Sequence, residues 1–362
     1  MRIGIDTQST MGRKTGIGSY TVNLLAALRK IAPDDEFVEL NWGRDVVMRT
    51  DRRLRWQQWG LGRAARKAVV ELLHVPGFDA PLWKPCPVVL TVHDLIGILF
   101  PENLPLVSRL YWSRWLPFTV RFADAIIADS ECTRRDIVRL LHVPDERIRV
   151  IYPGVGKSFR PQSARQVDAC RLRYSLPKDY ILYVGTIEPR KGVATIVEAL
   201  ARTRARHHLV IAGKRGWYWG SVLRRIAALN LEQQVHVLDY VPDADLPRLY
   251  SGAKAFVFPS RYEGFGLPVL EAMACGCPVI CSSTSSLPEV VGDAALLVAA
   301  GDPEPLAEAI DLLLESAHLQ QDLRERGLRR AGRFTWEDAA RLTLEVYGRV
   351  AAGELRVAWR GT

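Results

Sequence analysis

Apolar and polar positions alternate along the chain in the pattern of short buried strands, each followed by an amphipathic helix. Arg2–Asp6 and Ala125–Asp129 are apolar strands, and Gly16–Ile31 carries its apolar residues at helical spacing. Near-continuous apolar strands that alternate with helices are typical of parallel sheets covered by helices on both faces. The sequence therefore predicts an α/β fold.

The same pattern continues to the end of the chain. In the first half we predict further strands at 69–75, 87–92 and 149–152 and a helix at 131–141. In the second half we predict strands at 180–184, 207–212, 235–238, 255–258, 278–281 and 295–298 and helices at 193–203, 221–229, 244–251, 267–274, 303–314, 318–330 and 336–350.

One polar stretch interrupts the alternation. Residues 154–175 show no strong strand pattern and read as a connection with one short helix. A chain of 362 residues exceeds the ~250–300 residues that one core usually serves. We therefore expect two doubly wound domains, 1–158 and 159–337. Because such sheets bind ligands beyond the carboxyl ends of their strands, the expected site is a cleft between facing domains.

Composition and charge exclude several classes of protein. Hydrophobic residues make up 48% and charged residues 25% of the chain, which excludes a disordered protein. His93 and Asp94 interrupt the most apolar run, Val88–Phe100, so no membrane-spanning helix is predicted. Asp6 lies where a signal peptide would be apolar, so export is not indicated. The six cysteines form no CxxC pair, which predicts buried thiols in a reducing cytoplasm rather than a zinc site.

The positive charge is concentrated in the first half. The chain carries a net charge of +9, of which residues 1–160 contribute +7. This excess indicates an anionic partner: nucleic acid, an anionic membrane surface or a phosphorylated substrate. No nucleic-acid recognition motif occurs, so we expect no nucleic acid. In two stretches, 42–67 and 109–121, arginines alternate with aromatic residues, as at a membrane interface; the alternative is a protein surface over buried tryptophans. The aromatic residues are Trp42, Trp56 and Trp59 in the first stretch and Tyr111, Trp112, Trp115 and Phe118 in the second.

The segment 259–280, PSRYEGFGLPVLEAMACGCPVI, contains the strongest candidate chemistry. Gly264 and Gly266 lie at a strand-to-helix turn, where glycines let a ligand approach the backbone and the helix N-terminus attracts a diphosphate. Glu263 and Glu271 can both face that ligand, and carboxylates accept hydrogen bonds from the vicinal hydroxyls of a ribose or a hexose. The alternative is a simple glycine turn with two solvated glutamates.

A second strand-to-helix connection, VGTIEPRKG at 184–192, places Arg190 and Lys191 at the start of a helix. Cations are unfavourable there because the helix dipole is positive at its N-terminus. A bound phosphate would compensate for both charges. A solvated pair at the tip of a loop is the alternative.

The first half offers weaker candidates. Gly16 and Gly18 open the first helix, without the spacing of a dinucleotide fingerprint, so a turn that packs helix on strand is equally consistent. His93 lies at the end of a strand, where the site residues of such folds cluster, and Asp94 is adjacent, so a site residue and a structural histidine are equally consistent. The acidic string Asp243-Ala-Asp245 reads as a helix cap rather than a metal site.

Glu263, Glu271 and the seven residues between them resemble the motif of glycosyltransferase family 4, retaining enzymes with the GT-B fold of two tandem Rossmann-like domains. The segments ADSECTRRDI, VIYPGV, VGTIEPRKG, AGKRGW and PEVVGDAA, which begin at residues 128, 150, 184, 212 and 288, resemble the family in the expected order. The GTIEPRKG and GKRGW strings are similar to the bacterial mannosyltransferase branch that uses GDP-mannose. The resemblance covers nearly the whole chain.

The resemblance implies a role for each matched residue. Arg190 and Lys191 would hold the donor diphosphate, Glu263 would face the donor hexose, Glu271 would accept the ribose hydroxyls, and His93 would lie near the reaction centre. The remaining donor contacts would be Gly16, Gly18, Gly185, Phe265, Gly266, Leu267, Lys214 and Val241. The first domain would bind the acceptor and the second the nucleotide-sugar donor, and a helix at about 338–362 would cross back to the first domain.

The implied function is retaining transfer of a hexose, foremost mannose from GDP-mannose, to a glycan or lipid-linked acceptor in surface polysaccharide or lipopolysaccharide biosynthesis. Neither a metal nor another cofactor is implied. The location would be the cytoplasm, with peripheral binding to the inner face of its membrane. The alternatives are a GDP-rhamnose, UDP-hexose or dTDP-hexose donor, a related phosphorylase or epimerase, and a non-catalytic nucleotide-sugar-binding protein.

Overall fold

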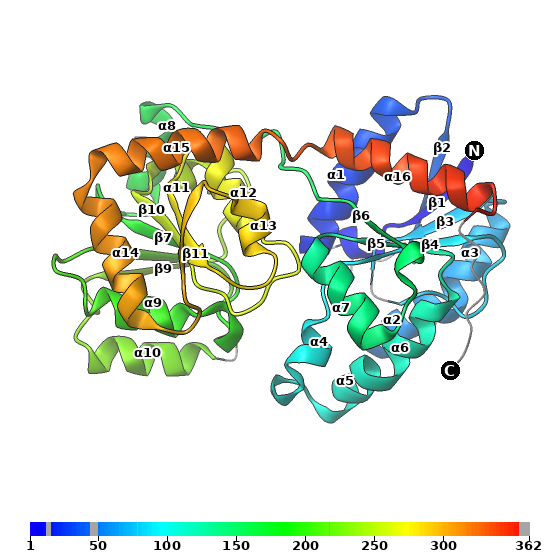
Figure 1. The fold of residues 1–362 in the computed structure, drawn as a ribbon, viewed down its shortest axis with the longest axis horizontal. Helices are drawn as coiled ribbons and strands as arrows, with labels where there is room; N and C mark the ends of the chain where they lie inside the picture. The colour runs from blue at the N-terminus through cyan, green and yellow to red at the C-terminus, as the bar shows by residue number, and fades with distance from the viewer. Residues whose placement is uncertain (12–15, 44–49, 78, 217, 355–362) are drawn as a thin grey trace. The chain divides into compact units, whose positions relative to one another are not determined.

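A computed structural model describes residues 1–11, 16–43, 50–77, 79–216 and 218–354. The chain divides into two compact units (Figure 1). Unit 1 comprises Met1–Gly154 together with the segment from Thr335 onward, and unit 2 comprises Val155–Phe334. The sequence analysis placed the boundary at residue 158 and the returning helix at about 338.

Unit 1 is built on six parallel strands in the order β2-β1-β3-β4-β5-β6. The predicted strand at 69–75 begins only at Leu72, because Val69 has a φ of 52° in the turn before it. The strand at 36–40 was missed, since its two glutamates hide its apolar pattern. The strands are β1 (Arg2–Asp6), β2 (Glu36–Leu40), β3 (Leu72–Val75), β4 (Val88–Val92), β5 (Ala125–Ala128) and β6 (Ile148–Val150).

Helices flank this sheet, and two basic stretches that we expected as surface segments are helical. Between 50 and 67, and between 106 and 122, short α-helices are joined by π-helical turns, η2 (Trp56–Gly60) and η4 (Tyr111–Trp115). The α-helices are α1 (Gly16–Ile31), α2 (Thr50–Arg55), α3 (Leu61–Lys67), α4 (Ile96–Leu99), α5 (Leu106–Leu110), α6 (Leu116–Thr119), α7 (Glu131–Leu141) and α16 (Trp336–Ala351). The 3-10 turns are η1 (Gln8–Thr10), η3 (Pro101–Asn103), η5 (Val120–Phe122) and η6 (Asp145–Arg147).

Helix α16 belongs to unit 1 and lies alongside α1 (Figure 1). The Trp336 ring meets the edge of Tyr20 at a centroid distance of 5.4 Å. From the same helix, the Tyr347 hydroxyl lies 2.6 Å from Nδ1 of His74, whose Nε2 is 2.8 Å from the hydroxyl of Thr91. Burial lowers the pKa of His74 to about 3, so this histidine is a neutral hydrogen-bonding link between α16 and the sheet.

Unit 2 contains a second parallel sheet, in the order β12-β11-β10-β7-β8-β9. Its strands are β7 (Ile181–Val184), β8 (Leu209–Ala212), β9 (Val235–Asp239), β10 (Ala255–Phe258), β11 (Val279–Ser282) and β12 (Ala295–Val298). Its helices are α8 (Ala164–Arg173), α9 (Val193–Leu200), α10 (Trp219–Ala228), α11 (Leu246–Gly252), α12 (Leu267–Ala274), α13 (Leu287–Val291), α14 (Pro303–Glu315) and α15 (Ala317–Ala331), with a 3-10 turn η7 (Pro189–Lys191) before α9.

The strand order of each sheet reverses at one position. In unit 2, β7 is followed in sequence by β8 on one side and later by β10 on the other, and in unit 1 β1 lies between β2 and β3. The loops that leave the two strands at such a reversal diverge, which opens a crevice at the carboxyl ends. The topology therefore directs attention to the loops after β7 and β10 and to those after β1 and β3. Within the described residues, no helix is long and apolar enough to cross a bilayer.

Candidate functional site

The loops after β7 and β10 approach each other closely at the reversal of unit 2. The Arg261 N–H donates to the Arg190 carbonyl at 2.9 Å. Gly192 has a φ of 72°, and a Cβ on it would lie 2.5 Å from the carbonyl oxygen of Pro259. Only glycine allows both this backbone conformation and this contact. The sequence analysis did not single out Gly192, although a glycine directly after two cations at a predicted helix start was a usable signal.

Glu263, Arg190 and Lys191 come together where these loops meet. One carboxylate oxygen of Glu263, Oε1, accepts hydrogen bonds from Arg190 at 2.9 Å, from the Lys191 ammonium at 3.1 Å and from the Ser260 hydroxyl at 2.7 Å. Glu263 is 8% exposed, and the Arg190 and Lys191 side chains are 10% and 14% exposed. The three predicted catalytic residues of unit 2 thus form one nearly buried cluster, and Ser260 is a fourth member that the motif did not indicate.

Burial and charge oppose each other in this cluster. Burial would raise the pKa of Glu263, but the charges of Lys191 and Arg190 and the Ser260 hydrogen bond hold it below its ordinary value. Glu263 is therefore ionised at neutral pH, and two cations share its charge. The prediction that a phosphate compensates for Arg190 and Lys191 is untested, because Glu263 does so in this structure. Both cations also lie in turn η7 before α9 rather than in the helix itself.

The glycine turn ahead of α12 is fixed by a serine from the loop before α13. Gly266 has a φ of 104° at the N-cap of α12, and a Cβ there would lie 2.6 Å from Leu287. The Ser286 hydroxyl donates to the carbonyl of Glu263 at 2.9 Å and to that of Phe265 at 2.8 Å. The Phe265 side chain is buried. Gly264, Phe265 and Gly266 are all buried, so the binding of a ligand by the backbone of this turn stays a prediction.

Glu271 lies one turn into α12 in a different environment from Glu263. Its Oε2 accepts a hydrogen bond from the Tyr250 hydroxyl at 3.0 Å. Burial raises the pKa of Glu271 to about 8, and Asp243 adds to the shift. Its carboxyl therefore carries a proton at neutral pH and can both donate to and accept from a hydroxyl. Among the described residues, no hydrogen bond joins the two glutamates.

The other predicted donor contacts are spread over the same edge of the sheet. Gly185 has a φ of 151°, and its carbonyl oxygen would lie 2.1 Å from a Cβ on Gly213, so the loops after β7 and β8 touch through two glycines. Lys214 is exposed, and its carbonyl accepts from the Ile187 N–H at 3.1 Å. The Val241 side chain is in the core, which leaves only its backbone for a ligand. Leu267 is the first residue of α12. Trp217, in the predicted AGKRGW segment, lies outside the described residues.

His93 is paired with an aspartate that the sequence analysis passed over. His93 follows β4 and Asp129 follows the neighbouring β5, and the His93 Nδ1 lies 2.6 Å from an Asp129 carboxylate oxygen. Burial would lower the pKa of His93, but Asp129 raises it above its ordinary value. The edge of Tyr20 covers the imidazole at 4.8 Å. Asp129 could have been found as a polar residue that directly follows an apolar strand.

Gly16 and Gly18 differ in their structural need for glycine. A Cβ on Gly18 would lie 2.5 Å from the Ser9 carbonyl, so this glycine lets α1 approach turn η1. A Cβ on Gly16 would meet nothing within 4 Å. Sterics inside unit 1 thus account for Gly18 and leave Gly16 open to another role. Residues 12–15 of this predicted segment lie outside the described residues.

The acidic string at 243–245 is not a helix cap, which corrects our expectation. Asp245 makes no capping hydrogen bond with its side chain. Instead its buried carboxylate accepts from Arg173 at 2.9 Å, from the Tyr174 hydroxyl at 2.8 Å and from Arg248 at 2.5 Å. It is therefore an ion-pair centre between α8 and α11. In the part of the chain that the structure describes, no three His, Cys, Asp or Glu side chains are grouped to hold a metal ion.

Comparison with known proteins extends this geometry. The model of the family described as "Glycosyltransferase Family 4" matches residues 16–158, and that described as "Glycosyl transferases group 1" matches residues 172–330. "O-antigen chain mannosyltransferase B" of Escherichia coli is 35% identical over 298 residues, which are 81% of this chain and 77% of the relative. "Serotype-specific mannosyltransferase WbdA" of Escherichia coli is 31% identical over 76% of this chain and 34% of its own length.

Among solved structures, "Sucrose-phosphate synthase" from Thermosynechococcus elongatus superimposes with a TM-score of 0.79 at 22% identity, over 98% of this chain and 100% of the other. This likeness confirms the predicted GT-B fold. The two family models together match both units, and the first Escherichia coli relative is covered over more than two thirds of its length. The chain therefore belongs to glycosyltransferase family 4.

Proposed function

We propose that this glycosyltransferase transfers mannose from GDP-mannose to a glycan acceptor, with retention of anomeric configuration and without a metal ion. Both Escherichia coli relatives are named as mannosyltransferases, and one name specifies an O-antigen chain. The single observation that carries the chemistry is the buried cluster of Arg190, Lys191 and Glu263 at the strand reversal of unit 2. It supplies fixed positive charge where a donor diphosphate would bind. This charge would neutralise the diphosphate, as a metal ion would otherwise do.

The proposed step separates GDP from the mannosyl group. The bond between C1 of mannose and the diphosphate oxygen breaks, and negative charge grows on that oxygen. Arg190 and Lys191 stabilise this charge, and each fixed donor of this kind typically contributes about 3 kcal/mol to lowering the barrier. The acceptor hydroxyl attacks C1 from the face that GDP leaves, so the configuration is retained. Its proton passes to the departing phosphate oxygen, which makes a separate protein base unnecessary.

Two carboxyl groups divide the recognition of the donor. Glu263 is ionised, and both of its carboxylate oxygens accept hydrogen bonds from Lys191, so it orients the cations beside the donor hexose. Glu271 is protonated at neutral pH and pairs with Tyr250, which suits hydrogen bonds with ribose hydroxyls. The contact of His93 with the donor sugar stays a prediction, with Asp129 as its positioning partner.

The test is incubation of the purified protein with GDP-mannose and a mannoside acceptor in buffer containing EDTA. We expect GDP release that depends on the acceptor and an α-linked product by NMR. Arg190→Ala should lower kcat by two orders of magnitude or more, since about 3 kcal/mol corresponds to more than 100-fold. Arg329→Ala, an exposed arginine of α15, is the matched control. Full turnover of the Arg190 variant would refute the assignment.

A donor panel separates this proposal from its alternatives. Thermal shifts with GDP, UDP, dTDP and ADP identify the nucleotide, and transfer assays with the matching nucleotide sugars identify the hexose. Preference for UDP or dTDP would refute GDP-mannose as the donor but leave the proposed transferase activity in place. Binding of a nucleotide sugar with no transfer to any acceptor would favour a non-catalytic binding protein. Release of sugar phosphate instead of nucleotide diphosphate would favour a phosphorylase.

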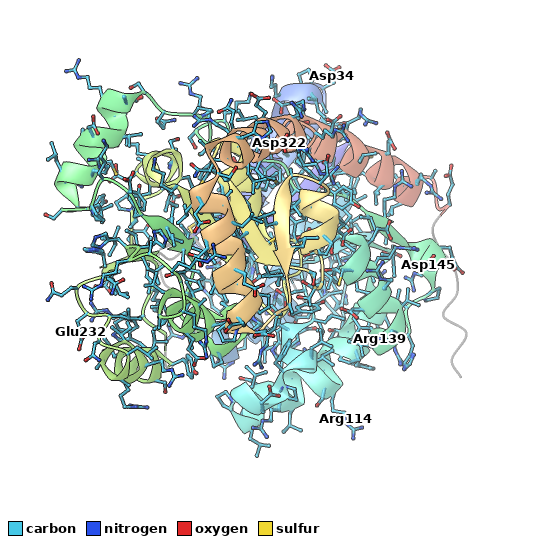
Figure 2. The ribbon with its side chains drawn as sticks, turned by 60° about the vertical axis from the view of Figure 1, so that its left-hand side comes forward. Asp34, Arg114, Arg139, Asp145, Glu232 and Asp322 are labelled. Atoms are coloured by element: carbon cyan, nitrogen blue, oxygen red, sulfur yellow. The ribbon has the colours of Figure 1, made fainter. Side chains whose placement is uncertain are left out.

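We also propose that unit 1 contacts an anionic membrane from the cytoplasmic side. Of the aromatic residues predicted for this role in 109–121, only Phe118 is exposed, whereas Tyr111 is buried. The structure adds Leu106, Val107 and Leu110, which are 72%, 70% and 57% exposed on and beside α5. Arg114 projects from the same segment (Figure 2). Exposed apolar side chains beside cations match a lipid surface, where each fully buried apolar side chain contributes about 1.5–3 kcal/mol and each basic residue about 1 kcal/mol.

Vesicle sedimentation tests the membrane proposal. The protein should sediment with phosphatidylglycerol vesicles at low salt, be released at high salt and ignore phosphatidylcholine vesicles. Val107→Glu should weaken sedimentation. Leu172→Glu alters a side chain of unit 2 that is 82% exposed and should leave sedimentation unchanged. Equal binding to neutral and anionic vesicles would contradict the proposal.

A further inference from the structure

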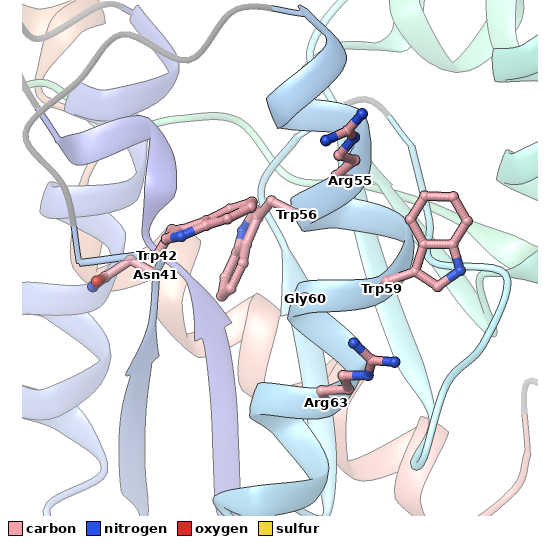
Figure 3. Close-up of a pocket in the computed structure, with 7 residues that line it drawn as sticks. All are labelled: Asn41, Trp42, Arg55, Trp56, Trp59, Gly60 and Arg63. Carbon is pink, nitrogen blue, oxygen red and sulfur yellow. The ribbon is translucent and has the colours of Figure 1, made fainter.

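Unit 1 contains a cavity that none of the site residues above lines. Its volume is about 680 Å³, within the range of small-molecule sites. Figure 3 shows Trp42 and Trp56 together on one side of the helical segment, Trp59 on its other side, and Arg55 and Arg63 spaced along it. The lining is completed by Asn41 and Gly60. Three indoles and two guanidinium groups around one hollow are an unusual concentration of binding chemistry.

One wall of this tryptophan pocket is fixed to the carboxyl ends of the first strands. The Trp56 Nε1–H donates to an Asp6 carboxylate oxygen at 3.0 Å, and Asp6 is the last residue of β1. The Trp42 N–H, two residues after β2, donates to the Gln8 side-chain oxygen at 2.8 Å. The Trp42 and Trp56 rings are 6.2 Å apart. The pocket is therefore held at the edge of the sheet where doubly wound folds bind ligands.

The helical floor of the pocket departs from α-helical geometry. Trp56–Gly60 forms a π-helical turn, and such turns are frequent at functional sites. A Cβ on Gly60 would lie 2.6 Å from the Trp56 ring, so only glycine leaves room for this ring position. Glycine inside a helix costs about 1 kcal/mol relative to alanine. A π-helical turn and a glycine inside a helix both destabilise this segment locally, and together they keep the Trp56 ring in its observed position.

The remaining side chains are presented to solvent rather than used for packing. Trp59 is 61% exposed and Trp42 is 42% exposed. Arg55 and Arg63 are exposed, and within the described residues neither makes an ion pair or a side-chain hydrogen bond. Arg63 lies eight positions after Arg55, a span of about 12 Å along a helix, which is comparable to the length of a disaccharide. Exposed indoles flanked by exposed guanidinium groups fit a ligand with apolar ring faces and negative charge.

We infer that the tryptophan pocket is an acceptor subsite that binds a glycan carrying a phosphate group. The axial C–H groups of a pyranose form an apolar, slightly positive face, which packs on the negative face of an indole. A guanidinium binds two phosphate oxygens at once, and charge-assisted hydrogen bonds of this kind are among the strongest in proteins. The inference rests on the proposed function only in taking the sugar to be mannosyl.

Direct binding tests the pocket without any transfer reaction. α-Mannose 1-phosphate, methyl α-mannoside and inorganic phosphate are titrated into the full-length protein, and binding is followed by calorimetry and tryptophan fluorescence. We expect the mannosyl phosphate to bind more tightly than either of its parts. Trp59→Ala should raise its Kd about fivefold, the effect of losing one aromatic contact. Arg63→Ala should raise its Kd about tenfold, the effect of losing one charge-assisted bond.

Matched controls separate the pocket from general effects. Arg66→Ala removes another exposed arginine of α3 that does not line the pocket, and it should leave the Kd unchanged. Melting temperatures of all variants should match that of the wild type, because the replaced side chains are exposed. In the transfer assay, Trp59→Ala and Arg63→Ala should raise the KM for a phosphorylated acceptor, whereas Arg66→Ala should leave this KM unchanged.

The binding results separate the inferred glycan subsite from the proposed function and from a lipid headgroup site. Unchanged affinity in both pocket variants would overturn the inference while leaving the proposed function intact. If the protein binds mannosyl phosphate in this pocket but does not use GDP-mannose, the proposed donor would be refuted and the inferred subsite supported. Loss of sedimentation with phosphatidylglycerol vesicles in the pocket variants, with mannosyl phosphate binding unchanged, would identify a lipid headgroup site and refute the glycan subsite.

Discussion

Replacing Glu263 by glutamine tests whether the negative charge of Glu263 stabilises the two cations of the cluster until a donor binds to them. The glutamine keeps the shape and one acceptor but removes the negative charge that Arg190 and Lys191 share. Both cations are nearly buried, and removal of one partner from a buried ion pair costs about 3–5 kcal/mol. For a domain of 150–250 residues, this corresponds to a drop in Tm of about 6–20 °C.

An anion should reverse much of this loss. In the Glu263→Gln variant, GDP or pyrophosphate supplies the missing negative charge to both cations. Ligand at 100 times its Kd adds about 2.7 kcal/mol of stability to any protein that binds it only when folded. We expect the increment from GDP at one fixed concentration to be larger in the variant than in the wild type, because there the cations have no competing carboxylate.

The assay is calorimetric melting of both proteins with and without GDP. Glu315→Gln is the control, because Glu315 is exposed and pairs with an exposed Arg204, so its loss should cost less than about 1 kcal/mol. If the Glu263 variant and the wild type have the same Tm, the cluster does not depend on a buried ion pair between Glu263 and the two cations. If GDP stabilises the wild type more than the variant, the diphosphate does not bind these cations.

Three further predictions concern other parts of the molecule. The pKa of His74 is lowered to about 3, so the contribution of this neutral histidine to the free energy of unfolding should be fully present above pH 6.5 and fall by about 1.4 kcal/mol per pH unit below that. Urea unfolding from pH 7 to pH 4 should show this slope, and His74→Asn should make the slope smaller. Gly192→Ala should destabilise unit 2 by more than about 1 kcal/mol and weaken GDP binding in calorimetry, whereas Gly348→Ala, where a Cβ meets nothing, should not. Asp129→Asn should lower the pKa of His93 in an imidazole NMR titration; an unchanged titration would contradict the pairing.

The loops of unit 2 show how far local patterns predict a site. Glycines at a strand-to-helix turn marked the segment 259–280, since close approach of a ligand to the backbone requires glycine, and two adjacent cations at a helix start marked the segment 184–192. The cations and the glutamate were identified individually, and their family was confirmed. Their mutual hydrogen bonds could not be predicted, because they depend on which strands become neighbours. The pairing of β7 with β10 brings Arg190 to Glu263, which lies 73 positions further along the chain.

Two of the missed residues share one property: Asp129 and Tyr250 act through a partner that is distant in sequence. Ser260 lies only three positions before its partner Glu263, but the motif did not indicate it. The acidic string at 243–245 misled us for a related reason. Its position at a helix start predicted a cap, but the buried Asp245 forms ion pairs with α8, which no local rule includes.

The sequence by itself determined the α/β alternation, the parallel strands and the identity of the charged residues, because these follow from local periodicity and turn chemistry, and it indicated the family through the resemblance of its motifs. Only the tertiary structure decided which of those residues share a charge, which tryptophans remain exposed around a cavity and which carboxyl group holds its proton at neutral pH. The physical reason is that ionisation and binding depend on burial and on neighbours in space, and the strand order of each sheet, rather than the order of residues along the chain, sets those neighbours.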